Sequence, residues 1–220
     1  MIFQFTETHR NPKPDLELLW GKSLANLLQA FNLKGLRALY SAIFLFHCGF
    51  SFFTTFISVF LITRFGFNQG RLGDFFAYVG IWVVFTQAVI TRRVSRFLQE
   101  REVLRFSLIF CGSGVLLYFL PKAAWQLLLV VPVFAVFNGL SQANLVGIVS
   151  RSVDASIQGE ILGINASIQA IAQAIPPILA GYLAARIFPT FPVLVSGCTI
   201  ILSGLLFITF YRPNPRPISQ

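Results

Sequence analysis

Charged residues are scarce in this chain and absent from most of its length. Only 11% of the 220 residues are Asp, Glu, Lys or Arg, whereas 55% are hydrophobic and the mean hydropathy is +0.73. A helix needs about 20 apolar residues, with a range of about 17–25, to cross the hydrocarbon core of a bilayer. Six stretches contain none of the four charged residues: 38–63, 75–91, 106–121, 123–150, 161–185 and 187–211. This pattern argues against a soluble protein and predicts an all-α membrane protein with six transmembrane helices.

Cysteine, histidine and acidic residues are also few, which narrows the possible chemistry. Cys48, Cys111 and Cys198 fall on different predicted spans with no disulfide or metal-ligand spacing, so we expect free, buried thiols and no metal site. The two histidines are His9 and His47, and no carboxylate lies within a predicted span. We therefore expect no cofactor. A group that takes up and releases protons within the spans would be His47 or belong to another polypeptide.

Positive charge is divided unevenly between the two faces that six spans create. One face holds the first forty residues, the loops at 92–105 and 150–160, and the C-terminal tail, with thirteen Lys and Arg in all. The other face holds four. Because Lys and Arg resist translocation, the first face is predicted to be cytoplasmic. We expect an integral multi-pass protein of the cell (inner) membrane with both termini in the cytoplasm, and no nucleic-acid partner.

The chain divides into a linker, a membrane domain and a short tail. Residues 1–37 are predicted to be a cytoplasmic linker, in which apolar residues recur at helical spacing from Leu16 to Phe31. This spacing predicts an amphipathic helix, either on the cytoplasmic membrane face or packed on its own domain. Residues 213–220 form the predicted cytoplasmic tail. The membrane domain is 38–212, with spans near 38–63, 74–91, 104–121, 124–149, 161–185 and 190–211.

A short sequence repeat precedes two of the spans. Gln69-Gly70-Arg71-Leu72-Gly73 leads into the second span, and Gln158-Gly159-Glu160-Ile161-Leu162-Gly163 leads into the fifth. In the predicted topology the first copy is outside and the second inside. This placement is expected if the domain consists of two three-helix repeats of inverted topology, which is a common plan of secondary transporters. Coincidence in a match this short is the alternative.

Polar side chains within the spans are of two kinds. The first, fourth and fifth spans carry hydroxyls, a histidine and amides along single helix faces, which indicates either a wet substrate path or interhelical hydrogen bonds. The third and sixth spans carry mainly Ser and Gly, which is typical of closely packed helices. Pro176-Pro177 predicts a break or kink in the fifth span. The candidate substrate-cavity residues are His47, Ser51, Thr54, Asn138, Gln142, Gln169 and Gln173.

Several loop motifs resemble those of a transporter family. Met1–His9 resembles the Phe-x-x-Pro-Glu-Thr exit from the sixth span of major facilitator superfamily transporters, with Thr6 in place of proline. Thr91–Phe97 is similar to the C-half copy of the family's basic loop motif, without its Gly and Asp. Ser156–Gly163 and Ala174–Gly181 resemble the drug/proton antiporter branch, which includes tetracycline-type exporters. The chain thus resembles the C-terminal half of such a transporter. The basic-loop residues are Arg92, Arg93 and Arg96.

The resemblance implies a function and a partner. It implies half of a secondary active transporter that moves a small, amphipathic, drug-like solute by alternating access, with export as the direction. It also implies that the first, second, fourth and fifth spans line the cavity. Because the family has twelve spans in two halves, a second six-span half or a second copy of this chain is the expected partner. A non-transporting scaffold or a truncated remnant is the alternative.

An enzyme is a further possibility that the residues themselves argue against. Cys111-Gly112-Ser113-Gly114 is similar to the serine motif of rhomboid proteases, which pair that serine with a histidine on a later span. No histidine follows Ser113 in this chain, so that serine has no base to activate it in such an arrangement. We therefore expect no enzymatic activity.

Overall fold

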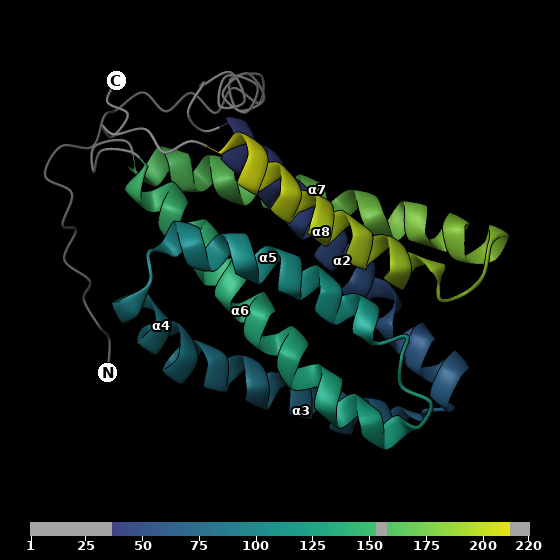
Figure 1. The fold of residues 1–220 in the computed structure, drawn as a ribbon. Coiled ribbons are helices and arrows are strands. Elements are labelled where there is room, and N and C mark those ends of the chain that lie inside the picture. Colours follow the sequence, from purple (N-terminus) through teal and green to yellow (C-terminus); the bar gives the residue numbers. More distant parts are fainter. Residues whose placement is uncertain (1–36, 153–157, 212–220) are drawn as a thin grey trace, which may run out of the picture.

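The computed structural model describes residues 37–152 and 158–211, and all regular structure in this part is helical (Figure 1). The predicted amphipathic helix and the tail at 213–220 lie outside the described residues. The elements are α2 (Arg37–Phe65), α3 (Gln69–Phe85), the π-helix η1 (Thr86–Thr91), α4 (Arg92–Phe97), α5 (Glu100–Leu117), the 3-10 helix η2 (Ala124–Gln126), α6 (Leu127–Arg151), α7 (Gln158–Arg186) and α8 (Phe191–Phe210).

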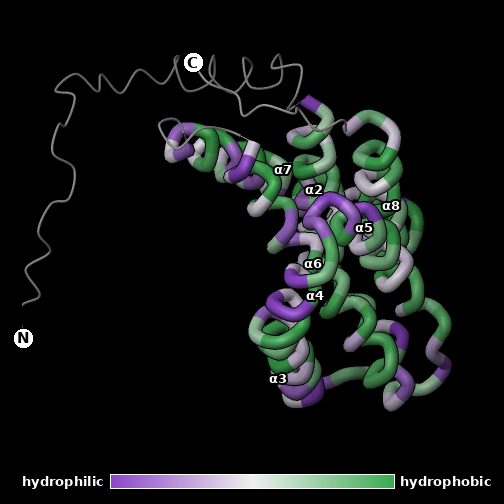
Figure 2. The backbone as a smooth tube through the Cα atoms, turned by 60° about the vertical axis from the view of Figure 1, so that its left-hand side comes forward, coloured by the Kyte–Doolittle hydropathy of each residue, from purple (hydrophilic) through white to green (hydrophobic). Residues whose placement is uncertain are grey.

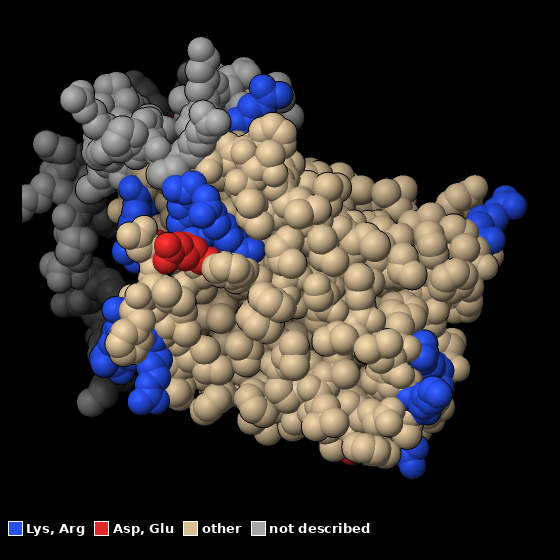
Figure 3. Space-filling model, viewed as in Figure 1, with Lys and Arg blue, Asp and Glu red and all other residues tan. Residues whose placement is uncertain are grey.

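Five helical segments of the described chain are long and apolar enough to cross a membrane: 37–65, 69–97, 124–151, 158–186 and 191–210. The segment 69–97 runs through α3, η1 and α4 without interruption. The third predicted span corresponds to α5, whose first two turns carry Glu100, Arg101, Glu102 and Arg105. Charged side chains gather at the two ends of the bundle and leave an uncharged band between them (Figure 3). The all-helical membrane architecture is therefore confirmed, while the limits of the membrane itself stay a prediction.

α3 and α7 begin before the spans that the sequence predicts for them. α3 begins at Gln69, five residues before the predicted span, because the side chain of Asn68 accepts a hydrogen bond from the Arg71 amide and caps the helix. α7 begins at Gln158 and includes Glu160 in its first turn. Both helices thus start at the glutamine of the sequence repeat.

The helices pack in the order α7, α2, α8, α5, α6 and α3, each against the next (Figures 1 and 2). α7 and α3 stand at the two ends of this order. In the most apolar 18 residues of α7, only 22% are buried, and in those of the segment from α3 to α4 only 11% are. The corresponding shares are 50% in α2 and 44% in the segment that contains α6. α3 and α7 therefore leave most of their surface uncovered by the rest of the described chain.

Glycine and serine bring α5 and α8 close to their neighbours, as the sequence predicted. A Cβ atom placed on Gly112 of α5 would lie 2.8 Å from the Gly197 carbonyl oxygen of α8, so the two backbones touch at this crossing. On the other side of α8, the hydroxyl of Ser203 donates to the carbonyl of Ala42 on α2 at 2.8 Å. α5 is joined to α6 by a bond of 3.0 Å from Ser141 to Ser107.

The expected break at Pro176-Pro177 does not occur, because α7 is helical from Gln158 to Arg186. Proline lacks an N–H, so Pro177 cannot bond to the carbonyl four residues earlier, which belongs to Gln173. The hydroxyl of Ser51 on α2 donates to that carbonyl at 2.9 Å. A neighbouring helix thus supplies the hydrogen bond that the proline removes, which explains how the helix continues in an apolar environment.

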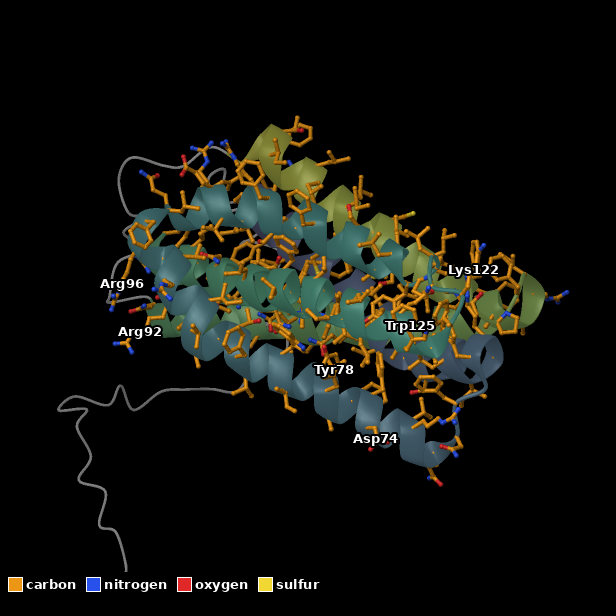
Figure 4. All side chains as sticks on the ribbon, turned by 60° about the horizontal axis from the view of Figure 1, so that its bottom comes forward. Asp74, Tyr78, Arg92, Arg96, Lys122 and Trp125 are labelled. Carbon is orange, nitrogen blue, oxygen red and sulfur yellow. The ribbon has the colours of Figure 1, made fainter. Side chains whose placement is uncertain are left out.

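The same arrangement occurs at the proline inside α6. Pro132 cannot bond to the carbonyl of Leu128, four residues earlier. The hydroxyl of Tyr78, which lies between α3 and α6 in Figure 4, donates to this carbonyl at 3.0 Å. Each pairing therefore ties a helix at the end of the packing order, α7 or α3, to the helix beside it.

We predict that Ser51→Ala destabilises the protein by about 0.6 kcal/mol and by no more than about 1.7 kcal/mol, the range for interhelical hydrogen bonds in membranes. The substitution leaves the Gln173 carbonyl unpaired. In a Pro177→Ala background the cost should be smaller, because the backbone N–H that this second substitution restores then donates to the carbonyl. The free energy of unfolding of the four proteins in detergent micelles measures the difference.

Thr54→Ala is the matched control on the same helix, because among residues 37–152 and 158–211 the Thr54 hydroxyl bonds to carbonyls of α2 alone, those of Phe50 and Ser51. It should change the stability little. An equal cost of Ser51→Ala with and without Pro177 would show that the hydroxyl does not replace the missing donor.

Candidate functional site

The polar residues predicted to line a cavity come from three helices, α2, α6 and α7. In Figure 2, α7 and α3 stand apart on one side of the bundle, with α2 and α6 between them and α5 and α8 on the other side. Hydrophilic residues recur along α7 in the same view. The side of the bundle that bears α3 and α7 is therefore the one on which these polar residues could be reached.

On α2 the predicted face carries three side chains in different environments. His47 is buried, with its ring edge against Phe46, and its Nδ1 atom has no hydrogen-bond partner in the described part of the chain. Ser51 is buried and bonded to the backbone of α7. Thr54 is exposed, and its hydroxyl bonds within α2. Of the three, Thr54 is the one open to a ligand.

The amides of α7 become more exposed along the helix. Asn165 is buried, and its Oδ1 atom lacks a hydrogen-bond partner among the described residues. Gln169 is half-buried and Gln173 is exposed. Gln173 contributes its backbone carbonyl to the bond with Ser51, which leaves its side-chain amide available. The structure therefore brings Ser51 of α2 and Gln173 of α7 together.

The amides of α6 form a separate group. Asn138 is buried, and its Oδ1 atom accepts a hydrogen bond of 3.3 Å from Nε2 of the half-buried Gln142. The i, i+4 spacing in the sequence indicated this pair. No hydrogen bond joins Asn138 or Gln142 to α2 or α7 within the described chain. The convergence of all seven predicted residues on one cavity accordingly stays a prediction.

Sequence reasoning missed the polar residues of the second span. Thr86, Gln87 and Thr91 lie on η1, the six-residue π-helix that joins α3 to α4. Thr86 is fully buried and packs against α6 at Gly139, where an added Cβ would lie 2.8 Å from Thr86 Cγ2. π-Helical turns are rare in proteins, and those that occur often lie at functional sites. Gln87 is exposed, and η1 becomes a fourth helix beside the three that carry the predicted polar residues. The Gln87 side chain was the signal in the sequence that could have revealed this segment.

The predicted basic loop lies at one end of the bundle. Arg92, Arg93 and Arg96 belong to α4 and are exposed, and Figure 4 shows Arg92 and Arg96 at the end opposite to Lys122 and Trp125. Next to them, Glu100 of α5 forms an ion pair with Arg151 of α6. Gly147 makes room for this carboxylate, since an added Cβ would lie 2.8 Å from Oε1 of Glu100.

The chemistry that these groups can support is reversible binding. Uncharged hydroxyls and amides offer hydrogen-bond donors and acceptors to a ligand. Among the described residues no group of three or more His, Cys, Asp or Glu is placed to hold a metal ion. The three cysteines are free, and Cys198 is exposed rather than buried as expected, because α8 has neighbours on only part of its circumference.

Comparison with known proteins places the chain in a family. The sequence profile of the Major Facilitator Superfamily matches residues 7–220. The tetracycline resistance protein, class H, of Pasteurella multocida is 27% identical over 148 residues, which are 67% of this chain and 37% of that protein. The class E protein of Escherichia coli is 23% identical over 153 residues, 69% of this chain and 38% of that protein. The matches thus span less than two-fifths of these relatives. With its long apolar helices the chain is an integral membrane protein, and it belongs, as its loop motifs predicted, to the Major Facilitator Superfamily of transporters.

Proposed function

We propose that this chain is half of a secondary active transporter that exports a small, amphipathic, drug-like solute by alternating access. The observation that carries the proposal is the uncovered amide face of α7. Gln169 and Gln173 lie within an uncharged stretch of 25 residues. Even so, Gln169 is only half-buried and Gln173 is exposed. Polar groups facing hydrocarbon are costly, so such a face is expected to border a wet cavity or another protein surface.

The direction and the kind of substrate follow from the relatives. Two proteins that match this chain are named for tetracycline resistance. Export of a small organic molecule across the cell (inner) membrane would give such resistance, and we extend that activity to this chain. Identities of 27% and 23% support the class of solute rather than the same molecule.

We also propose that the domain is built from two inverted repeats, α2–α5 and α6–α8. Exchanging the two repeats pairs α2 with α6, α3 with α7, and α5 with α8. The interhelical hydrogen bonds agree with this exchange. The bond between α2 and α7 in one place corresponds to the bond between α6 and α3 in the other. In the same way, the bond between α8 and α2 corresponds to the bond between α5 and α6. The equivalent starts of α3 and α7, at Gln69 and Gln158, add support. Such repeats form the ground plan of many secondary transporters.

Alternating access requires a second bundle that rocks against this one around a shared site. α3 and α7 stand at the ends of the packing order and expose most of their surface, including Gln87 and Gln173. A second six-span half, or a second copy of this chain, would cover that surface and close the cavity. We propose such a partner.

We predict that the end bearing α4 is cytoplasmic. Seven of the arginines and lysines of the described residues lie at that end, and four lie at the other. In a background without Cys48, Cys111 and Cys198, cysteine at Gln69 should therefore react with an impermeant thiol reagent added outside intact cells. Cysteine at Gln99 should react only after permeabilisation. The opposite pattern would reverse the orientation.

We predict that water reaches the amide faces but not the packing faces of the bundle. In the same background, single cysteines at Gln142 and Gln173 should react with a water-soluble thiol reagent. Cysteines at Ser107 and Ser203 should not, because both serines are buried in helix contacts. Equal protection at all four positions would indicate that the amides only join helices.

Reconstitution of the purified chain tests the function itself. We predict that vesicles containing the chain with its partner half, or as a dimer, take up a tetracycline-like fluorescent solute against its gradient when a proton gradient is applied. Gln173→Ala should slow this uptake while the fold remains intact. A correctly folded assembly without any solute movement would favour a scaffold or remnant, and transport by a single copy would refute the need for a partner.

A further inference from the structure

Two cavities of different character adjoin each other at the α4 end of the bundle. One has a volume of about 310 Å³ and is lined by polar and charged residues of 95–100 and by Arg151. The other has a volume of about 520 Å³ and is lined by apolar residues, with Arg93 as its single charged member. Phe97 and Leu98 line both cavities. The two cavities adjoin at these side chains, and we refer to the pair as the amphipathic cleft.

The apolar part of the cleft follows the helix that runs from α3 through η1 into α4. Its wall consists of Phe85, Val89, Ile90, Val94 and Phe97. Three of these side chains are strongly exposed, Phe85 by 45%, Val89 by 41% and Phe97 by 81%. Its length along three helical turns and its lack of polar groups suit a hydrocarbon chain.

The polar part of the cleft carries a net positive charge. Arg96 and Arg151 line it with a single carboxylate, that of Glu100, which is already paired with Arg151. Arg93 lines the adjoining apolar part. Ser95 and Gln99 add groups that can form hydrogen bonds. Arginine recognises phosphate well, because its planar guanidinium presents several N–H donors to the oxygens.

The position of the cleft matches a lipid rather than a transported solute. Its lining passes from the uncharged residues Phe85, Val89 and Ile90 to the arginines of α4, so it lies where an apolar helix meets a charged end. α7, which carries Gln169 and Gln173, stands at the other end of the packing order from α3. The amides of α7 are therefore distinct from the cleft.

We propose that this cleft binds an anionic phospholipid of the cytoplasmic leaflet. The acyl chain lies along Phe85, Val89 and Ile90, and the headgroup phosphate is held by Arg93 and Arg96. The assignment to the cytoplasmic leaflet rests on the orientation proposed above. Basic pockets beside membrane helices on that side are suited to anionic headgroups, since the leaflet itself is negatively charged.

The test is native mass spectrometry of the full chain extracted from nanodiscs of phosphatidylethanolamine with a minor fraction of phosphatidylglycerol. We expect phosphatidylglycerol to be retained preferentially. Each arginine near the membrane contributes about fivefold to the affinity, so Arg93→Gln with Arg96→Gln should weaken retention by roughly 25-fold. Val89→Trp fills the apolar part without changing the charge and should also reduce retention.

The matched control is Arg71→Gln with Arg186→Gln, which removes two exposed arginines from the other end of the bundle. It should leave retention unchanged. Equal loss in both double variants would overturn the site in favour of general charge attraction. Retention insensitive to Val89→Trp, together with equal binding of inorganic phosphate, would show a free-anion site instead. None of these measurements depends on transport, so they stand apart from the test of the proposed function.

Discussion

The requirement that every backbone carbonyl in a membrane finds a partner governs how this bundle is held together. Prolines inside α6 and α7 remove N–H donors from apolar segments long enough to cross a membrane. The carbonyls of Leu128 and Gln173 are instead paired by hydroxyls from α3 and α2. Pro132 and Pro177 therefore each make one helix depend on the presence of another. α7 and α3, the least covered helices, are attached to the bundle in this way.

This dependence divides the bundle into connected pairs. α2 with α7 and α6 with α3 are joined by hydroxyl bonds to carbonyls that prolines leave without a donor. α5 and α8 are also joined to the rest by hydroxyl bonds, and in addition by small residues that allow backbone contact. Glycine crossings such as Gly112 against Gly197 tolerate little sliding, because an added methyl group would already collide with backbone. The α5–α8 side is thus suited to act as a rigid support, and the α3 and α7 side to carry the polar surface.

The sequence was sufficient to predict the all-helical architecture, the close packing of the Ser- and Gly-rich spans and the pairing of Asn138 with Gln142. These features follow from local composition and helical spacing. The continuity of α7 was not predictable, because the donor to Gln173 lies 122 residues away along the chain. The π-helix at Thr86–Thr91 packs against Gly139 of α6 through Thr86, a contact that no local pattern signals. The burial of Cys198 was predicted wrongly, because hydropathy shows that a residue lies in an apolar span but not whether it faces lipid or protein.

Polar residues on one helix face can serve two purposes that only the structure separates. Ser51 falls on the same face as His47 and Thr54, yet its hydroxyl is committed to the backbone of α7. The same bond fixes the backbone of Gln173 and leaves the amide of that residue exposed. The structural role of Ser51 therefore supports a functional role for Gln173, because a fixed backbone orients the side chain that it carries. In this chain the hydroxyls and prolines build the helix contact, and the amides of α7 remain free to meet a ligand.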